Sequence, residues 1–172
     1  MTRAEMTKIF AAMLLVYPRA ESFKGGIAAL KPTIELWTRT LPDVDYWTGE
    51  QALYRIFREC KFPPTPAEFL AAANSVKSEI SGHLSEAKSY IRMLADLEDC
   101  SMEECYAKLH PENLSRQAID AIGGPDKLLI PHESSGGVSY TWNWDAFDTA
   151  YEAILRKEIS LPGNGQKALP GV

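Results

Sequence analysis

The residues of this chain that could ligate a metal are few, and most lie far apart in the sequence. Three cysteines and three histidines occur, and only Cys100, Cys105 and His110 fall within one short stretch. Zinc sites need several such ligands, often supplied by a CxxC pair, and no CxxC occurs here. We therefore interpret Cys105 as a residue that packs a helix, and we predict no metal site.

Carboxylate pairs and phosphate-binding loops, which many enzymes use, are not evident either. Glu103 and Glu104 are adjacent, so on a helix they point in different directions and cannot face each other across a cleft as glycosidase carboxylates do. The chain has no GxxxxGK[ST], GxGxxG, GxSxG or HExxH motif, and these motifs mark common nucleotide-binding and hydrolytic sites. The sequence predicts a protein that is not an enzyme and binds no cofactor, with an unrecognised enzyme as a minor alternative.

Aromatic side chains are the remaining candidates for a functional site, because they anchor many protein interfaces. Trp37 lies in a regular apolar stripe, so we expect it in the core. Trp142 lies where a loop meets the last expected helix, so it either packs against that helix, which we favour, or contacts a partner. The residues that we predict to contact a partner are Trp142, Trp144, Tyr151 and Phe62.

Helices are the elements that we expect to position these residues, because apolar residues recur at helical spacing and strand-type alternation is not sustained anywhere in the chain. Thr2 and Glu5 have the spacing of a capping box, and Thr65 and Glu68 repeat that spacing with Pro66 at the first helical position. The expected helices of the first 80 residues begin at Thr2, near Lys31, after Asp43 or Asp45, and at Pro66.

The remaining elements are less regular. An apolar pattern from Phe69 to Leu94 continues in phase through Gly82, so either one long helix or two stacked helices would fit it. Short helices are expected from Ser101 and from Leu114, a loop over His132–Gly137, and a last helix from Trp144.

These elements predict an all-α fold: an N-terminal four-helix bundle followed by a second, smaller helical region. We place the N-terminal domain at residues 1–80, the C-terminal helical region at 81–159, and a flexible tail at 160–172, where Leu-Pro-Gly occurs twice with little else that is apolar.

Charge is distributed unevenly between the two halves. Residues 1–80 carry ten Lys or Arg and nine Asp or Glu, whereas residues 81–172 carry eight and fourteen. Proteins that bind DNA through its phosphates usually present a basic surface, so we expect no direct contact with nucleic acid. The most apolar N-terminal stretch, residues 9–17, is too short to span a bilayer, and unpaired cysteines suit a reducing compartment. We therefore expect a cytoplasmic protein without membrane contact.

Three segments of the first 73 residues carry a family resemblance. They are Leu-Val-Tyr-Pro at 15–18, Ile-Glu-Leu-Trp at 34–37 followed by Leu41 and Asp43, and Lys-Phe-Pro-Pro-Thr-Pro-Ala-Glu-Phe at 61–69. In this order and at these spacings the segment set resembles the N-terminal domain of the helicase loader–inhibitor family of Gram-positive phages. Residues 114–159 are more weakly similar to related phage replication proteins, through Ala-Ile-Gly-Gly at 121–124 and the spacing of Trp144, Phe147 and Tyr151.

The resemblance implies a function that the residues alone do not show. Members of this family bind the hexameric, DnaB-type replicative helicase, hold it inactive and deliver it to an origin-bound initiator. The implied partners are the helicase and, beyond it, a replication initiator or a single-strand-binding protein, in the host cytoplasm of a phage or prophage. Two alternatives remain open, namely a structural or tail-assembly helper protein without catalytic activity and a DNA-binding initiator.

Within the third segment, Phe62 is expected to be a buried aromatic anchor where the third helix turns into the fourth. If the ring lies on the surface instead, Phe62 becomes a candidate partner contact.

Overall fold

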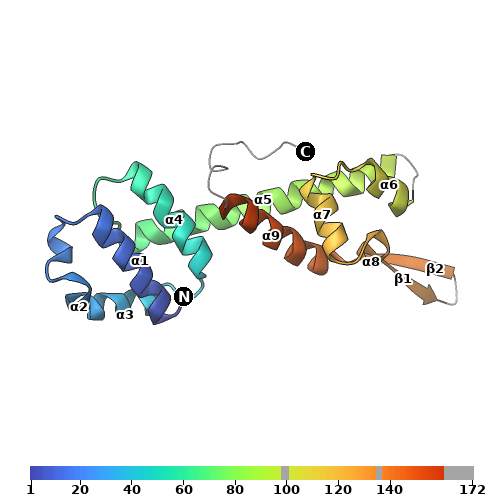
Figure 1. The fold of residues 1–172 in the computed structure, drawn as a ribbon. Coiled ribbons are helices and arrows are strands. Elements are labelled where there is room, and N and C mark those ends of the chain that lie inside the picture. The colour runs from blue at the N-terminus through green and yellow to red at the C-terminus, as the bar shows by residue number, and fades with distance from the viewer. Residues whose placement is uncertain (98–100, 135–136, 161–172) are drawn as a thin grey trace. The chain divides into compact units, whose positions relative to one another are not determined.

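The computed structural model describes residues 1–97, 101–134 and 137–160. These residues are mostly helical, which confirms the predicted all-α class apart from one two-stranded hairpin. The chain divides into two compact units, Met1–Glu79 and Ile80–Val172, and each is described separately below (Figure 1). Within the described residues, no helix combines the length and the apolar character that crossing a bilayer requires.

The first unit contains helices that begin at the four predicted starts, together with a 3-10 helix and a four-residue α-helix that the sequence does not predict. The predicted starts are confirmed, with Thr2 as the N-cap of the first helix, Lys31 at the start of the second and Asp45 as the N-cap of the third. The elements are α1 (Arg3–Val16), the 3-10 turn η1 (Glu21–Phe23), α2 (Gly26–Ala29), α3 (Lys31–Thr40), α4 (Tyr46–Glu59) and the start of α5 (Pro66–Leu97).

Capping boxes fix where α1 and α5 begin. The Thr65 backbone N–H donates to Glu68 Oε2 at 2.7 Å, and the Glu68 N–H donates back to Thr65 Oγ1 at 3.3 Å. Thr2 and Glu5 repeat this reciprocal pair at the start of α1. Donation to the carboxylate favours its charged form, so the hydrogen bonds from Thr2 and Thr65 lower the pKa of Glu5 and of Glu68.

Aromatic rings from three helices form the core of the first unit. Phe10 of α1 meets Trp37 of α3 edge-on, with ring centroids 5.0 Å apart, and Trp37 in turn meets Phe69 of α5 at 5.6 Å. All three rings are buried, so the core position predicted for Trp37 is confirmed. Gly49 lets α4 approach this cluster closely, because a Cβ there would lie 3.3 Å from the Phe69 ring and 3.1 Å from Met1.

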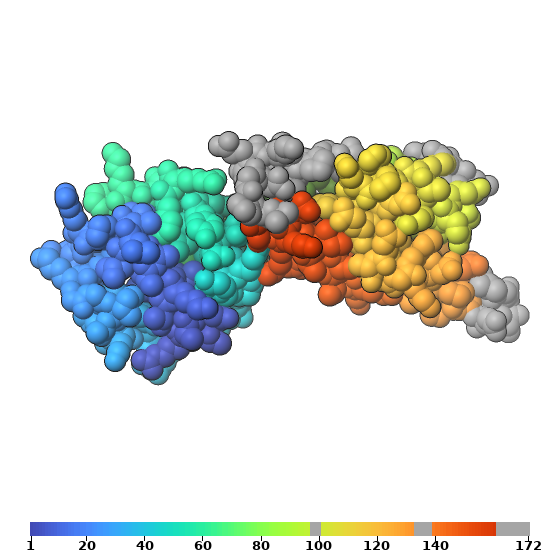
Figure 2. All heavy atoms as spheres, viewed as in Figure 1, coloured from blue at the N-terminus to red at the C-terminus, as the bar shows by residue number. Residues whose placement is uncertain are grey.

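The second unit contains the rest of α5, three short helices, a hairpin and a final helix. Its elements beyond α5 are α6 (Met102–Lys108), α7 (Leu114–Ala121), α8 (Pro125–Leu128), β1 (Leu129–Ser134), β2 (Gly137–Trp142) and α9 (Trp144–Ser160). Helices α7 and α9 pack directly against each other, as Figure 2 shows in yellow and red. Ala118, Ile119, Phe147 and Leu155 lie fully buried on the two helices.

One uninterrupted helix, α5, accounts for the long apolar pattern. Of the two arrangements that the sequence allowed, the single helix is the one observed. Gly82 lies exposed in its interior, and a Cβ at this position would meet nothing within 4 Å. The helix therefore tolerates a glycine whose cost, relative to alanine, is about 1 kcal/mol.

Substituting Gly82 with alanine should raise the free energy of unfolding by about 0.5–1 kcal/mol, because alanine restricts the unfolded chain and meets no clash in the helix. Denaturant unfolding of the full chain measures this change. Gly25→Ala is the matched control and should destabilise, since Gly25 has a φ of 92° and its added Cβ would lie 2.8 Å from Ala29 Cβ. A loss of stability in Gly82→Ala would contradict the continuous helix.

The prediction of a loop over His132–Gly137 is wrong for the part of it that the structure describes, residues 132–134 and 137. Strands β1 and β2 form an antiparallel hairpin in which Leu129 pairs with Trp142 and Pro131 pairs with Tyr140. Proline is compatible with a strand that has an unpaired edge, and in the described residues this sheet has only two strands. The predicted tail over 160–172 lies, except for Ser160, outside the described residues.

Candidate protein-interaction surfaces

The residues considered as metal ligands do not form a site in the described structure. Cys105 lies buried in α6, and His110 lies exposed beyond the end of that helix, while Cys100 falls outside the described residues. Among the residues that can be described, no group of three or more His, Cys, Asp or Glu side chains could hold a metal ion.

Phe62 is exposed, so the expectation that it is a buried anchor is wrong. Phe62 lies in the segment that connects α4 to α5, and it is 78% accessible to solvent. Pro64 and Phe69, which follow it, are the buried residues of this connection. Because they occupy the core positions, the Phe62 ring is left on the surface, where the sequence had placed it only as an alternative.

Two further apolar residues lie exposed at the C-terminal end of α1. Leu15 is 82% accessible and Val16 is 46% accessible. We call Leu15, Val16 and Phe62 the corner patch, because each lies within two residues of Tyr17 or Cys60, whose contact joins the two chain segments. Large apolar side chains that are exposed to solvent are candidates for a protein–protein interface.

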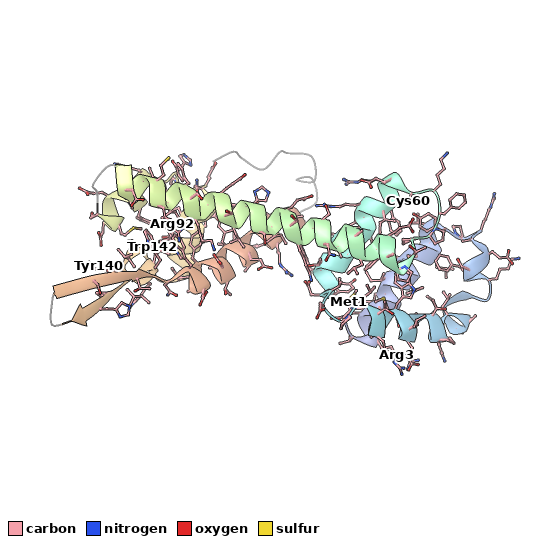
Figure 3. All side chains as sticks on the ribbon, turned by 180° about the vertical axis from the view of Figure 1, so that it is seen from behind. Met1, Arg3, Cys60, Arg92, Tyr140 and Trp142 are labelled. Carbon is pink, nitrogen blue, oxygen red and sulfur yellow. The ribbon has the colours of Figure 1, made fainter. Side chains whose placement is uncertain are left out.

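Tyr17 connects the two parts of the corner patch. Its hydroxyl donates to the Cys60 carbonyl oxygen at 3.0 Å, and its ring meets Phe57 edge-on at 5.7 Å. Tyr17 directly follows Val16, and Cys60 (labelled in Figure 3) lies two residues before Phe62. The contact therefore holds the end of α1 beside the turn that carries Phe62, and burial raises the pKa of the Tyr17 hydroxyl.

Basic side chains accompany the corner patch. Arg19 follows α1, while Arg58 and Lys61 flank the end of α4, and all three are exposed. No ion pair joins any of them to another described residue. Glu59 is the acidic neighbour on α4. An apolar patch beside these cations suits a partner surface that is apolar with an acidic rim.

In the second unit, the structure brings together two of the predicted partner residues. Trp142 ends β2 and Trp144 begins α9, and their rings stack with centroids 4.7 Å apart and an interplanar angle of 10°. The Arg92 guanidinium of α5 lies 5.0 Å from the centre of the Trp144 ring. Figure 3 shows Arg92, Trp142 and Tyr140 in the same part of this unit.

These contacts give Trp144 a structural role. Its ring meets Phe147 edge-on at 5.6 Å, and Lys88, which lies over the same ring, forms an ion pair with Asp148 at 2.8 Å. Both tryptophans are half-buried. The stack joins the end of the hairpin to α9 and α5, and leaves only part of each ring for a partner.

Tyr151 and Tyr140 differ from what the sequence suggested. Tyr151 is only 7% accessible and packs on Phe147, so it offers a partner almost no contact area. Burial raises the pKa of its hydroxyl. Tyr140, which we did not predict as a site residue, is 61% accessible. Tyr140 and Trp142 are two residues apart, which places them on the same face of a strand, and this spacing could have identified Tyr140 as a site residue.

Comparison with known proteins finds a similarity over most of the first unit. Residues 1–70 match the family model for the N-terminal domain of the gene 39 protein, the helicase loader/inhibitor of phage SPP1. Neither the curated proteins nor the solved structures yield a significant match. The matched residues run from α1 into the start of α5 and include all three segments on which the predicted resemblance rests. Over residues 1–70 this chain is therefore similar to the N-terminal domain of the gene 39 protein family of phage helicase loader–inhibitors.

Proposed function

We propose that this chain is a phage or prophage replication accessory protein that binds a hexameric, DnaB-type replicative helicase and loads or inhibits it. The match of residues 1–70 to the N-terminal domain of the gene 39 protein is the observation that carries the proposal. This family regulates a helicase and is not itself a catalyst. Binding alone is sufficient for such a role, and it requires complementary surfaces rather than reactive groups.

The corner patch is the surface that we assign to the helicase. It lies within the matched residues, and Leu15 and Phe62 are its most exposed apolar side chains. Removing such side chains from water provides the main driving force for association, and a few aromatic anchors usually dominate the binding energy. Arg58 and Lys61 would orient the encounter through acidic groups on the helicase.

The charge of this chain makes direct binding to nucleic acid a poor alternative to helicase binding. The first unit is nearly neutral and the second carries an excess of acidic residues, so neither has the basic composition that phosphate binding usually needs. We place the protein in the host cytoplasm, with a replication initiator or a single-strand-binding protein as a further partner of the assembled complex.

Phe62→Ala should weaken binding to the helicase by about tenfold, since truncating one aromatic anchor costs on the order of 1–2 kcal/mol. The dissociation constant is measured by calorimetry with purified helicase and ATP. Leu36→Ala is the matched control, because Leu36 is 61% exposed on α3 but lies outside the patch. It should bind as the unchanged chain does. Equal affinities for the two variants would remove the corner patch from the proposal.

A further inference from the structure

The second unit contains a hollow of about 600 Å³ beside the β1–β2 hairpin. One face of the β1–β2 hairpin forms a wall of it. Side chains alternate between the two faces of a strand, and the register pairs Leu129 with Trp142 and Pro131 with Tyr140. All four residues line the hollow, and the two on β2 give this wall its aromatic rings.

The starts of α6 and α8 contribute two carboxyl groups to the same hollow. Glu103 lies in the first turn of α6 and Asp126 in the first turn of α8, and both side chains line the hollow. Hydrogen bonding to Glu103, followed by the negative charge of Glu103, raises the pKa of Asp126. The pKa of Glu103 is lowered, first by its own backbone N–H and then by Asp126. Two neighbouring carboxylates repel each other, and a cation between them would relieve that repulsion.

We propose that this hollow binds a lysine or arginine side chain on a basic segment of a protein partner. The aromatic wall from Tyr140 and Trp142 offers ring faces on which a guanidinium or an alkyl stem can lie. The carboxylates of Glu103 and Asp126 supply the paired acceptors that a guanidinium matches with two hydrogen bonds. Lys127 also lines the hollow and offsets one of the two negative charges.

Charge on the whole unit favours this occupant over others. Residues 81–172 carry fourteen acidic and eight basic side chains, which steers a basic segment towards the unit. The same excess repels phosphates, and it repels a second copy of this unit. Because the hollow and the corner patch lie in different units, this inference does not depend on the proposed helicase contact.

Fluorescence anisotropy of a labelled nine-residue glycine–serine peptide with two central arginines, titrated with the full chain, tests the proposal. The double variant Glu103→Gln, Asp126→Asn should bind this peptide about tenfold more weakly than the unchanged chain. The control double variant Glu112→Gln, Asp145→Asn removes the same charge from exposed positions outside the lining. It should change the affinity by less than about twofold.

A third variant tests the aromatic wall separately. Tyr140→Ala removes an exposed ring and should lower the affinity for the peptide by about threefold. This is the expected effect of losing one exposed cation–π contact. Equal losses of affinity in the two double variants would mean that peptide binding depends only on the overall charge of the chain, and would overturn the site. Absence of peptide binding would overturn it too. Binding of free spermidine as tight as that of the peptide would assign the hollow to a small cation instead.

Discussion

Substituting Phe69 with alanine is expected to lower the free energy of unfolding of the first unit by about 3–5 kcal/mol, the usual cost of emptying a buried aromatic site. Phe69 is completely buried, meets the Trp37 ring edge-on at 5.6 Å and lies beneath Gly49. Neighbours held by three other helices cannot collapse into the space that the ring leaves. Urea unfolding of a fragment of residues 1–80, followed by far-ultraviolet circular dichroism, measures the change.

Phe62→Ala in the same fragment is the control, and its stability should change by no more than about 0.5 kcal/mol. The two phenylalanines lie seven residues apart, one exposed and one buried, so they separate a surface role from a core role. A large loss in Phe62→Ala would contradict the exposed position. A fragment that gives the spectrum of a random coil before any substitution would contradict a self-contained first unit.

Phe147→Ala is expected to have an effect of similar size in the second unit, again about 3–5 kcal/mol. Phe147 is completely buried in α9, between the rings of Trp144 and Tyr151 at 5.6 Å each. The aromatic row should therefore loosen as a whole when its central ring is removed.

Hydrogen exchange of the α7 and α9 backbone amides in the full chain measures this second effect, since local and global opening set their protection. Thr149→Ala, on the exposed side of α9, is the control and should leave the protection of α7 unchanged. Full protection of both helices in Phe147→Ala would show that Phe147 is not the centre of this core.

The sequence predicts the helix starts well because local contacts determine them. Thr2 with Glu5 and Ser101 with Glu104 form capping boxes at the predicted positions. Each box needs only residues three apart and a backbone N–H at either end. Local spacing therefore carries enough information to place these helix ends, whatever packs against them later.

The sequence predicts the candidate site less well because long-range packing decides which aromatic ring is exposed. Phe62 lies on the surface since Pro64 and Phe69 take the buried positions around it. Tyr151 is buried because it lies on the same side of α9 as Phe147, and α9 packs against α7. Neither outcome can be derived from spacing alone, which gives the faces of a helix but not the elements that cover them.

The hairpin shows a different reason for a wrong prediction. Tyr140 and Trp142 do alternate with Ser139 and Thr141, but the pattern is short and Pro131 interrupts the segment that pairs with it. Only the tertiary structure shows that the apolar face of the hairpin has a hollow to line. The alternation that is typical of a strand is present in the sequence, but it covers too few residues to outweigh the interpretation as a loop.

Sedimentation velocity of the purified full chain, mixed with the hexameric replicative helicase in the presence of ATP, tests the central claim most directly. We predict that the two proteins sediment together and that Phe62→Ala weakens this complex while Leu36→Ala does not. Separate sedimentation of helicase and chain under these conditions, together with capture of the chain by a phage tail or tape-measure protein, would contradict the account.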